Sequence, residues 1–232
     1  MKPPIASLPF YPRWILANGI GESLGLGTTF FLLLLAPHWE TGPSALTILG
    51  AAAGAILLGA AVEGVLIGWA QAKLLHRRFA KIRVTDWIKA TMIGTGLAWM
   101  IGSLPNAIGG LADLSRTTGC ENAPPAGGGP PLWWTMIFAA GLGAMVGPVL
   151  GFAQGRVLHR AGHSEIHWMR ANSIAWLCGM PVIFLLLHFA PWTGSLPVLA
   201  LAFYLITFVA GCVVGAVHGR YLTAERPIAP TS

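Results

Sequence analysis

Residues 45–72 read ALTILGAAAGAILLGAAVEGVLIGWAQA, and this stretch decides the fold class. Its single charged side chain is Glu63, and its other residues are apolar, small or weakly polar. About 20 predominantly apolar residues are enough to cross the hydrocarbon core of a bilayer. The stretch lacks the alternation of apolar and polar residues that a strand of a membrane barrel requires. We therefore expect a membrane-spanning α-helix here.

The whole chain has the composition of a membrane protein. Its 232 residues are 55% hydrophobic and 9% charged, and the mean hydropathy is +0.67. Soluble domains carry roughly 25% charged residues, so lipid must cover much of this surface. The composition excludes intrinsic disorder, a secreted disulfide scaffold and a cytosolic enzyme. It predicts one transmembrane domain over residues 1–232.

Six apolar stretches follow one another along the chain, and they predict an all-α integral membrane protein with six transmembrane helices. They are residues 14–36, 45–72, 87–104, 132–155, 168–190 and 195–219. Lys and Arg accumulate on the cytoplasmic side of membrane proteins, and all 14 except Arg116 fall on one side of these spans. Both termini are therefore expected in the cytoplasm of a bacterium, with the helices in its inner (plasma) membrane. This topology accounts for the net charge of +6 without a nucleic acid partner.

A motif recurs at the end of every second span. The pattern GxxxGxx[QH]x[KR]xL appears as GVLIGWAQAKLLHR, GPVLGFAQGRVLHR and GCVVGAVHGRYL, which begin at Gly64, Gly147 and Gly211. A second pattern, Trp-x-x-Ala followed by Asn or Thr, begins the alternate spans at Trp14, Trp87 and Trp168. The chain therefore divides into three equally oriented two-helix repeats, arranged around a pseudo-threefold axis or as sequential hairpins. The repeats cover about residues 14–77, 87–160 and 168–222.

Each repeated position has a structural use. The tryptophans are expected to anchor the helices at the inner membrane interface. Glycine pairs let two helix backbones approach closely, which matters where lipid gives helices little hydrophobic reason to associate. These packing glycines are Gly64, Gly68, Gly147, Gly151, Gly211 and Gly215. The repeated polar positions are Gln71, Gln154, His218, Thr91 and Asn172.

The tandem unit, GxxxGxxQ followed by LxR and then WxxAN, resembles that of a loose group of uncharacterised bacterial multi-pass membrane proteins. The resemblance covers nearly all the helical part of the chain. It implies a multi-pass helical fold and brings no activity, substrate or cofactor with it.

Two glutamates inside the predicted spans form a candidate proton or cation site. Glu22 lies eight residues after Trp14, and Glu63 lies eight residues before Gln71. Both are thus expected about 12 Å from the inner edge, at about 1.5 Å per residue. Asn18 continues the polar stripe, and no Lys or Arg lies at this depth. Ionisable side chains inside a membrane are costly and suggest function. The structural alternative is that both carboxyls are protonated and hydrogen-bond neighbouring helices.

Other chemistry has weaker support. His38 and His188, near the outer ends of the first and fifth spans, are weak candidates for a metal or haem site. Motifs of hydrolases, zinc proteases and nucleotide-binding loops are missing from the sequence, so we expect no enzyme activity and no cofactor, with haem or pigment as the open alternative. An outer loop is expected over about residues 105–131 and contains Cys120. It could form a cap, a gate or a docking surface, or be only a solvated connection.

The leading interpretation is a non-enzymatic structural or accessory subunit of a larger membrane complex, whose partners are lipid and other membrane subunits. The first alternative is a small transporter or channel with an intramembrane proton or cation site at Glu22 and Glu63. The second is a pigment- or haem-binding subunit. A transporter should direct Glu22, Glu63, Asn18 and Thr95 toward one water-accessible cavity. An accessory subunit should instead bury them between helices and present a flat apolar face of Gly and Ala or of Trp to a partner.

Overall fold

The computed structural model describes residues 9–35, 44–117, 130–190 and 194–224, and all regular structure in these ranges is helical. In chain order the elements are α1 (Phe10–Glu22), η2 (Ser23–Gly27), α2 (Thr28–Leu35), α3 (Ala45–Leu58), η3 (Gly59–Glu63), α4 (Gly64–Arg78), α5 (Val84–Thr117), α6 (Leu132–Arg160), α7 (Glu165–His188) and α8 (Leu196–Ala224). The elements η2 and η3 are single π-helical turns. Residues 10–35 and 45–78 therefore each form one continuous helix.

Five helices in the described ranges are long and apolar enough to cross a membrane. They are Phe10–Leu35, Ala45–Arg78, Leu132–Arg160, Glu165–His188 and Leu196–Ala224. Helix α5 is the longest single element at 34 residues, but glycines and polar residues such as Thr91 and Thr95 dilute its apolar character. The described chain is thus an all-helical membrane protein, and the sixth span stays a prediction.

Helix α5 runs further than the sequence predicted. Pro105 lies inside it, and the helix continues to Thr117. Proline is tolerated in membrane helices because neighbouring groups satisfy the carbonyl that it leaves free. Residues 105–117, which we expected to belong to the outer loop, are therefore helical. Cys120 and His38 lie outside the described residues.

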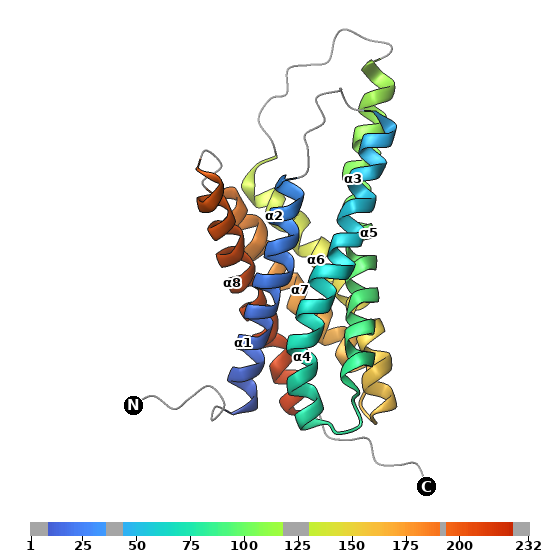
Figure 1. Cartoon of the computed structure of the whole chain (residues 1–232), viewed down its shortest axis with the longest axis vertical. Coiled ribbons are helices and arrows are strands. Elements are labelled where there is room, and N and C mark those ends of the chain that lie inside the picture. Colours follow the sequence, from blue (N-terminus) through green and yellow to red (C-terminus); the bar gives the residue numbers. More distant parts are fainter. Residues whose placement is uncertain (1–8, 36–43, 118–129, 191–193, 225–232) are drawn as a thin grey trace.

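The helices run along a common long axis, and the first and last of them begin and end at the same end of the bundle (Figure 1). Helix–helix contacts lead from α1 to α4, α5, α6, α7 and α8, and α8 packs against α1 again. The main bundle is therefore a closed ring. Helix α3 and the later part of α5 pair with each other and extend beyond the remaining helices (Figure 1).

The six glycines of the repeated motif all lie at helix–helix contacts. A Cβ atom at Gly64 would lie 2.6 Å from the Met92 Cα on α5, and one at Gly211 would lie 2.6 Å from the Asn18 carbonyl oxygen on α1. A Cβ atom at Gly151 would lie 2.8 Å from the Met169 Cα on α7. Each glycine-bearing helix thus packs against a helix that begins with a repeated tryptophan.

The repeated tryptophans do not anchor the helices at the membrane interface as we expected. Trp14, Trp87 and Trp168 are buried in the interior of the bundle, where they form the centre of one apolar cluster. The sequence places these residues near the inner edge but does not tell which way they face. Close packing at the glycines brings three helices near enough for the indoles to meet each other.

Candidate functional site

The three buried indoles form a layer across the bundle. Trp168 lies between the other two, with ring centroids 6.5 Å from Trp14 and 5.8 Å from Trp87, both in edge-to-face geometry. Such pairs are favourable because the positive edge of one ring faces the negative face of another. We call Trp14, Trp87 and Trp168 the tryptophan layer.

The residue four positions after each tryptophan holds the helix start in place. The Asn18 amide donates to the Trp14 carbonyl oxygen at 2.8 Å, and the Asn172 amide donates to the Trp168 carbonyl oxygen at 3.0 Å. The Thr91 hydroxyl donates to the Trp87 carbonyl oxygen at 2.9 Å in the same way. This local bond explains why Asn or Thr follows the tryptophan at this spacing.

A buried hydrogen-bond network joins the first two copies of the motif. The Trp87 indole N–H donates to the Gln71 Oε1 at 3.0 Å, and the Trp168 indole N–H donates to the Gln154 Oε1 at 3.1 Å. The Gln71 amide donates to the Asn18 Oδ1 at 2.8 Å. The Gln154 amide in turn donates to the Thr91 hydroxyl at 3.0 Å and to the Gln71 Oε1 at 3.3 Å. Each glutamine therefore accepts from the tryptophan of the following repeat.

The third copy of the motif lacks this bond. His218 stands where the other copies have glutamine. The next residue, Gly219, packs against the Trp14 indole, and a Cβ atom built on this glycine would lie 3.1 Å from the Trp14 Cδ1. The Trp14 Nε1 and both ring nitrogens of His218 are nevertheless buried without a hydrogen-bond partner in the described residues. The His218 ring packs instead on Trp168, with centroids 4.9 Å apart.

The two glutamates lie beside the two π-helical turns. Glu22 directly precedes η2 and Glu63 ends η3, and they are 4% and 5% exposed. The turns contact each other, and a Cβ atom at Gly25 would lie 2.9 Å from the Glu63 Cα. The Trp99 indole N–H donates to the Glu63 Oε2 at 2.7 Å, whereas the Glu22 Oε2 is buried without a described partner. Turns of this kind occur frequently at functional sites.

Both glutamates and His218 line one small cavity inside the bundle. Its volume is about 20 Å³, and its lining combines polar side chains with a few apolar ones. The lining residues are Glu22, Glu63, Ile67, Gln71, Thr91, Thr95, Leu150, Gln154, Asn172, Trp176, Val214 and His218. Asn18 reaches this set through its bond with Gln71. We call this space the central cavity; it is polar and large enough for a water molecule.

A second aromatic layer lies on the opposite side of the glutamates. Phe30 contacts Trp99 in edge-to-face geometry with ring centroids 5.8 Å apart, and it lies 5.9 Å from Phe203. Along the first continuous helix, Glu22 is eight residues from both Trp14 and Phe30. At about 1.5 Å per residue, Glu22 thus lies about 12 Å along the helix from Trp14 and from Phe30, whereas Glu63 contacts the second layer directly through its bond with Trp99.

The weak metal candidates gain no support. His188 is exposed at the end of α7, where its ring contacts Phe189 at a centroid distance of 5.1 Å. The described residues contain no group of three His, Cys, Asp or Glu side chains that could hold a metal ion. Cys178 and Cys212 are free and half-buried.

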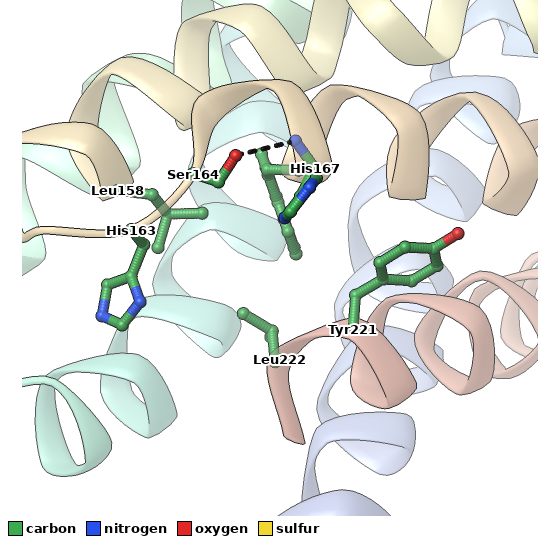
Figure 2. Close-up of a pocket in the computed structure, with 7 residues that line it drawn as sticks. Leu158, His163, Ser164, His167, Tyr221 and Leu222 are labelled. Carbon is green, nitrogen blue, oxygen red and sulfur yellow. Dashed lines mark hydrogen bonds between the residues drawn. The ribbon is translucent and has the colours of Figure 1, made fainter. Parts of the chain in front are cut away.

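A second hollow of about 10 Å³ lies where α6 turns into α7 (Figure 2). Figure 2 shows Ser164 at the start of α7, where its hydroxyl accepts a hydrogen bond from the His167 backbone N–H at 3.3 Å. The His163 ring contacts Phe79 at a centroid distance of 4.4 Å. Because Ser164 serves as an ordinary helix cap here, we assign this hollow a structural role.

Sequence reasoning found the two glutamates, Thr95 and the repeated polar positions. It missed Trp99 and Trp176, and it treated His218 only as a variant of the motif. The substitution of His for Gln was itself a signal, since a titratable group replaces a neutral one. No protein-family model, curated protein or solved structure matches this chain, and the site is therefore interpreted from its own geometry.

Proposed function

We propose that this chain moves protons or small cations across a bacterial inner membrane through a site formed by Glu22 and Glu63. The single observation that carries the proposal is that both carboxyls line the central cavity, inside the bundle and between two aromatic layers. In this proposal the chain crosses the membrane six times, with both termini in the cytoplasm and no enzyme activity.

The proposed architecture is three two-helix repeats around a pseudo-threefold axis. The closed ring of helix contacts supports it, as does the equivalent placement of the glycine pairs against the next tryptophan-bearing helix. The last such contact joins α8 to α1, which sequential hairpins without closure would not require. A central pathway along the axis would then run through the tryptophan layer, the central cavity and the second aromatic layer.

The shared cavity of the polar residues supports a transport role. Glu22, Glu63 and Thr95 line the same cavity, and Asn18 is bonded to a fourth lining residue, Gln71. A carboxyl that only joined helices would use both oxygens in hydrogen bonds, because an unpartnered polar atom is costly away from water. The Glu22 Oε2 has no such partner in the described chain. A bound proton, cation or water would satisfy it.

The test is ion flux in vesicles. Purified protein is placed in liposomes that contain a dye sensitive to H⁺, Na⁺ or K⁺, and the gradient of the matching ion is imposed in separate runs. We expect flux of at least one ion in wild-type vesicles, and a large loss in Glu22→Gln and Glu63→Gln. Glu165→Gln is the matched control, because Glu165 lies in the first turn of α7 and does not line the cavity. Vesicles no more permeable than protein-free ones would refute the proposal.

The accessory-subunit function stays as a second candidate because one packing motif is unused. Gly50 and Gly54 form a GxxxG pair on α3, and nothing lies within 4 Å of a Cβ atom built on either. Leu46 on the same helix is 77% exposed. Such a pair would suit close contact with a helix of another membrane subunit. Mild purification without crosslinking, followed by mass spectrometry and an absorption spectrum, would reveal stoichiometric subunits and any haem or pigment.

A further inference from the structure

We infer that the transported ion is the proton, and that His218 is the proton-binding residue on the inner side of the Glu22–Glu63 pair. This inference rests on the function proposed above and adds a residue and an ion to it. It is carried by three described features: the empty hydrogen-bonding positions of His218, its place in the lining of the central cavity, and the small size of that cavity.

His218 is the motif position that the network leaves free. The two equivalent glutamines each accept an indole N–H and donate an amide hydrogen to a neighbour. Their side chains are thereby fixed. His218 is 2% exposed and lines the cavity, yet both of its ring nitrogens lack a described partner. A buried side chain with one nitrogen that donates and one that accepts has the chemistry of a proton relay.

The groups around His218 define where protons can go. The titratable residues that share its cavity are Glu22 and Glu63. On the remaining surface of α8, the Tyr11 hydroxyl donates to the Ala216 carbonyl oxygen and the Arg78 guanidinium donates to the Leu222 carbonyl oxygen. Those two groups are directed to backbone atoms. The glutamates are therefore the partners for proton exchange.

The proton step needs no other reactant. A protonated Glu22 or Glu63 carboxyl releases its proton to a water molecule in the central cavity, and that water passes a proton to the free nitrogen of neutral His218. The imidazolium that results carries an N–H group on each ring nitrogen and releases the proton of its second nitrogen to a water molecule on the far side of the ring, because the indole N–H groups of the tryptophan layer can only donate. The carboxylate then takes a new proton from the opposite side. One proton moves in each cycle, and the imidazole ring then turns over so that its free nitrogen faces the central cavity again; charge, protons and tautomer are thereby restored.

The cavity suits a proton better than a metal cation. Cations such as Ca²⁺ take six to eight oxygen ligands, and Mg²⁺ keeps several of its waters, whereas a volume of about 20 Å³ holds about one water molecule. The amide oxygens nearby are also in use, since the Gln71 and Gln154 Oε1 atoms accept indole N–H groups. A cation that keeps its shell of several waters therefore does not fit in this volume.

The decisive variant is His218→Gln, which places in the third copy of the motif the residue found in the other two. Glutamine should fold well, because it can accept the unpartnered Trp14 indole N–H. It cannot carry a proton. We expect proton flux in vesicles to fall about 100-fold, while thermal stability in detergent stays at or above that of the wild type. Na⁺ and K⁺ gradients should produce no flux in any variant.

A second readout follows the imidazole itself. In protein labelled with ¹⁵N-histidine and held in nanodiscs, His218→Gln identifies the His218 signals by their disappearance. These signals should shift when Glu22→Gln or Glu63→Gln is introduced, and they should stay unchanged in Glu165→Gln. A purely structural histidine would keep one neutral tautomer, so its two ¹⁵N signals would stay at the positions of one protonated and one unprotonated ring nitrogen in every variant.

The outcomes separate the two proposals. If both cavity glutamate variants lose flux but His218→Gln conducts protons like the wild type, this inference is wrong and the proposed function stands. If Na⁺ or K⁺ moves and protons do not, the inference is again wrong while the glutamate site is supported. If wild-type vesicles carry no ion at all, the proposed function itself fails.

Discussion

Replacing Gln154 by leucine should destabilise the folded bundle by about 3 kcal/mol, whereas the same change at His218 should cost about 1 kcal/mol or less. The Gln154 side chain makes three hydrogen bonds, to Trp168, Thr91 and Gln71. Hydrogen bonds between membrane helices contribute about 0.6 kcal/mol each on average, so their loss removes about 2 kcal/mol. The Trp168 indole N–H would then be buried without an acceptor, which adds about 1 kcal/mol.

His218→Leu removes no described hydrogen bond, because neither ring nitrogen has one, and it replaces a buried ring by an apolar side chain. Reversible unfolding in mixed micelles of dodecyl maltoside and dodecyl sulfate measures both free energies in one protein background. The comparison is matched, since the two positions are equivalent in the repeated motif. Equal destabilisation by the two substitutions would refute the view that the third copy of the motif is released from the network.

Two further predictions each compare the unfolding free energies of two matched variants. Gly211→Val should lower the unfolding free energy by about 1–3 kcal/mol by overpacking, because a Cβ atom there would meet the α1 backbone. Gly50→Val should change the unfolding free energy little, since nothing lies within 4 Å of a Cβ atom at that position. Comparable effects of the two substitutions would contradict the α8–α1 contact. Trp87→Phe should cost about 1 kcal/mol more than Trp14→Phe, because only the Trp87 indole N–H has a described acceptor. Unfolding in mixed micelles tests this pair too, and a larger cost at Trp14 would argue against the assigned network.

Apolar length and charge were enough to predict an all-helical membrane protein. The sequence also predicted that Glu22 and Glu63 lie at a similar depth in the bundle. Each is eight residues from a repeated motif position, Trp14 or Gln71, and the rise per residue of a helix converts this spacing into depth. Both glutamates do line one cavity. The six-span topology, the side of the membrane on which the termini lie and the function stay predictions.

Direction around the helix axis was harder to predict than depth. Trp14, Trp87 and Trp168 lie near the ends of apolar stretches, where tryptophan usually faces the lipid headgroups, yet here they meet in the interior. Their burial depends on how closely three separate helices approach, which no single stretch of sequence specifies. The continuation of α5 through Pro105 is a similar case, since local breaker rules were derived for helices in water.

The π-helical turns next to Glu22 and Glu63 have a consequence for the way this chain can change. A π turn holds one residue more than an α-helix would place there, and one residue corresponds to a rotation of about 100° around the helix axis. The π turn Gly59–Glu63 absorbs this extra residue, so a single-residue deletion within it would restore a regular α-helix while α3 and α4 keep their orientation. A residue could thus be gained or lost beside the acid site by a one-codon event that leaves the surrounding bundle in place.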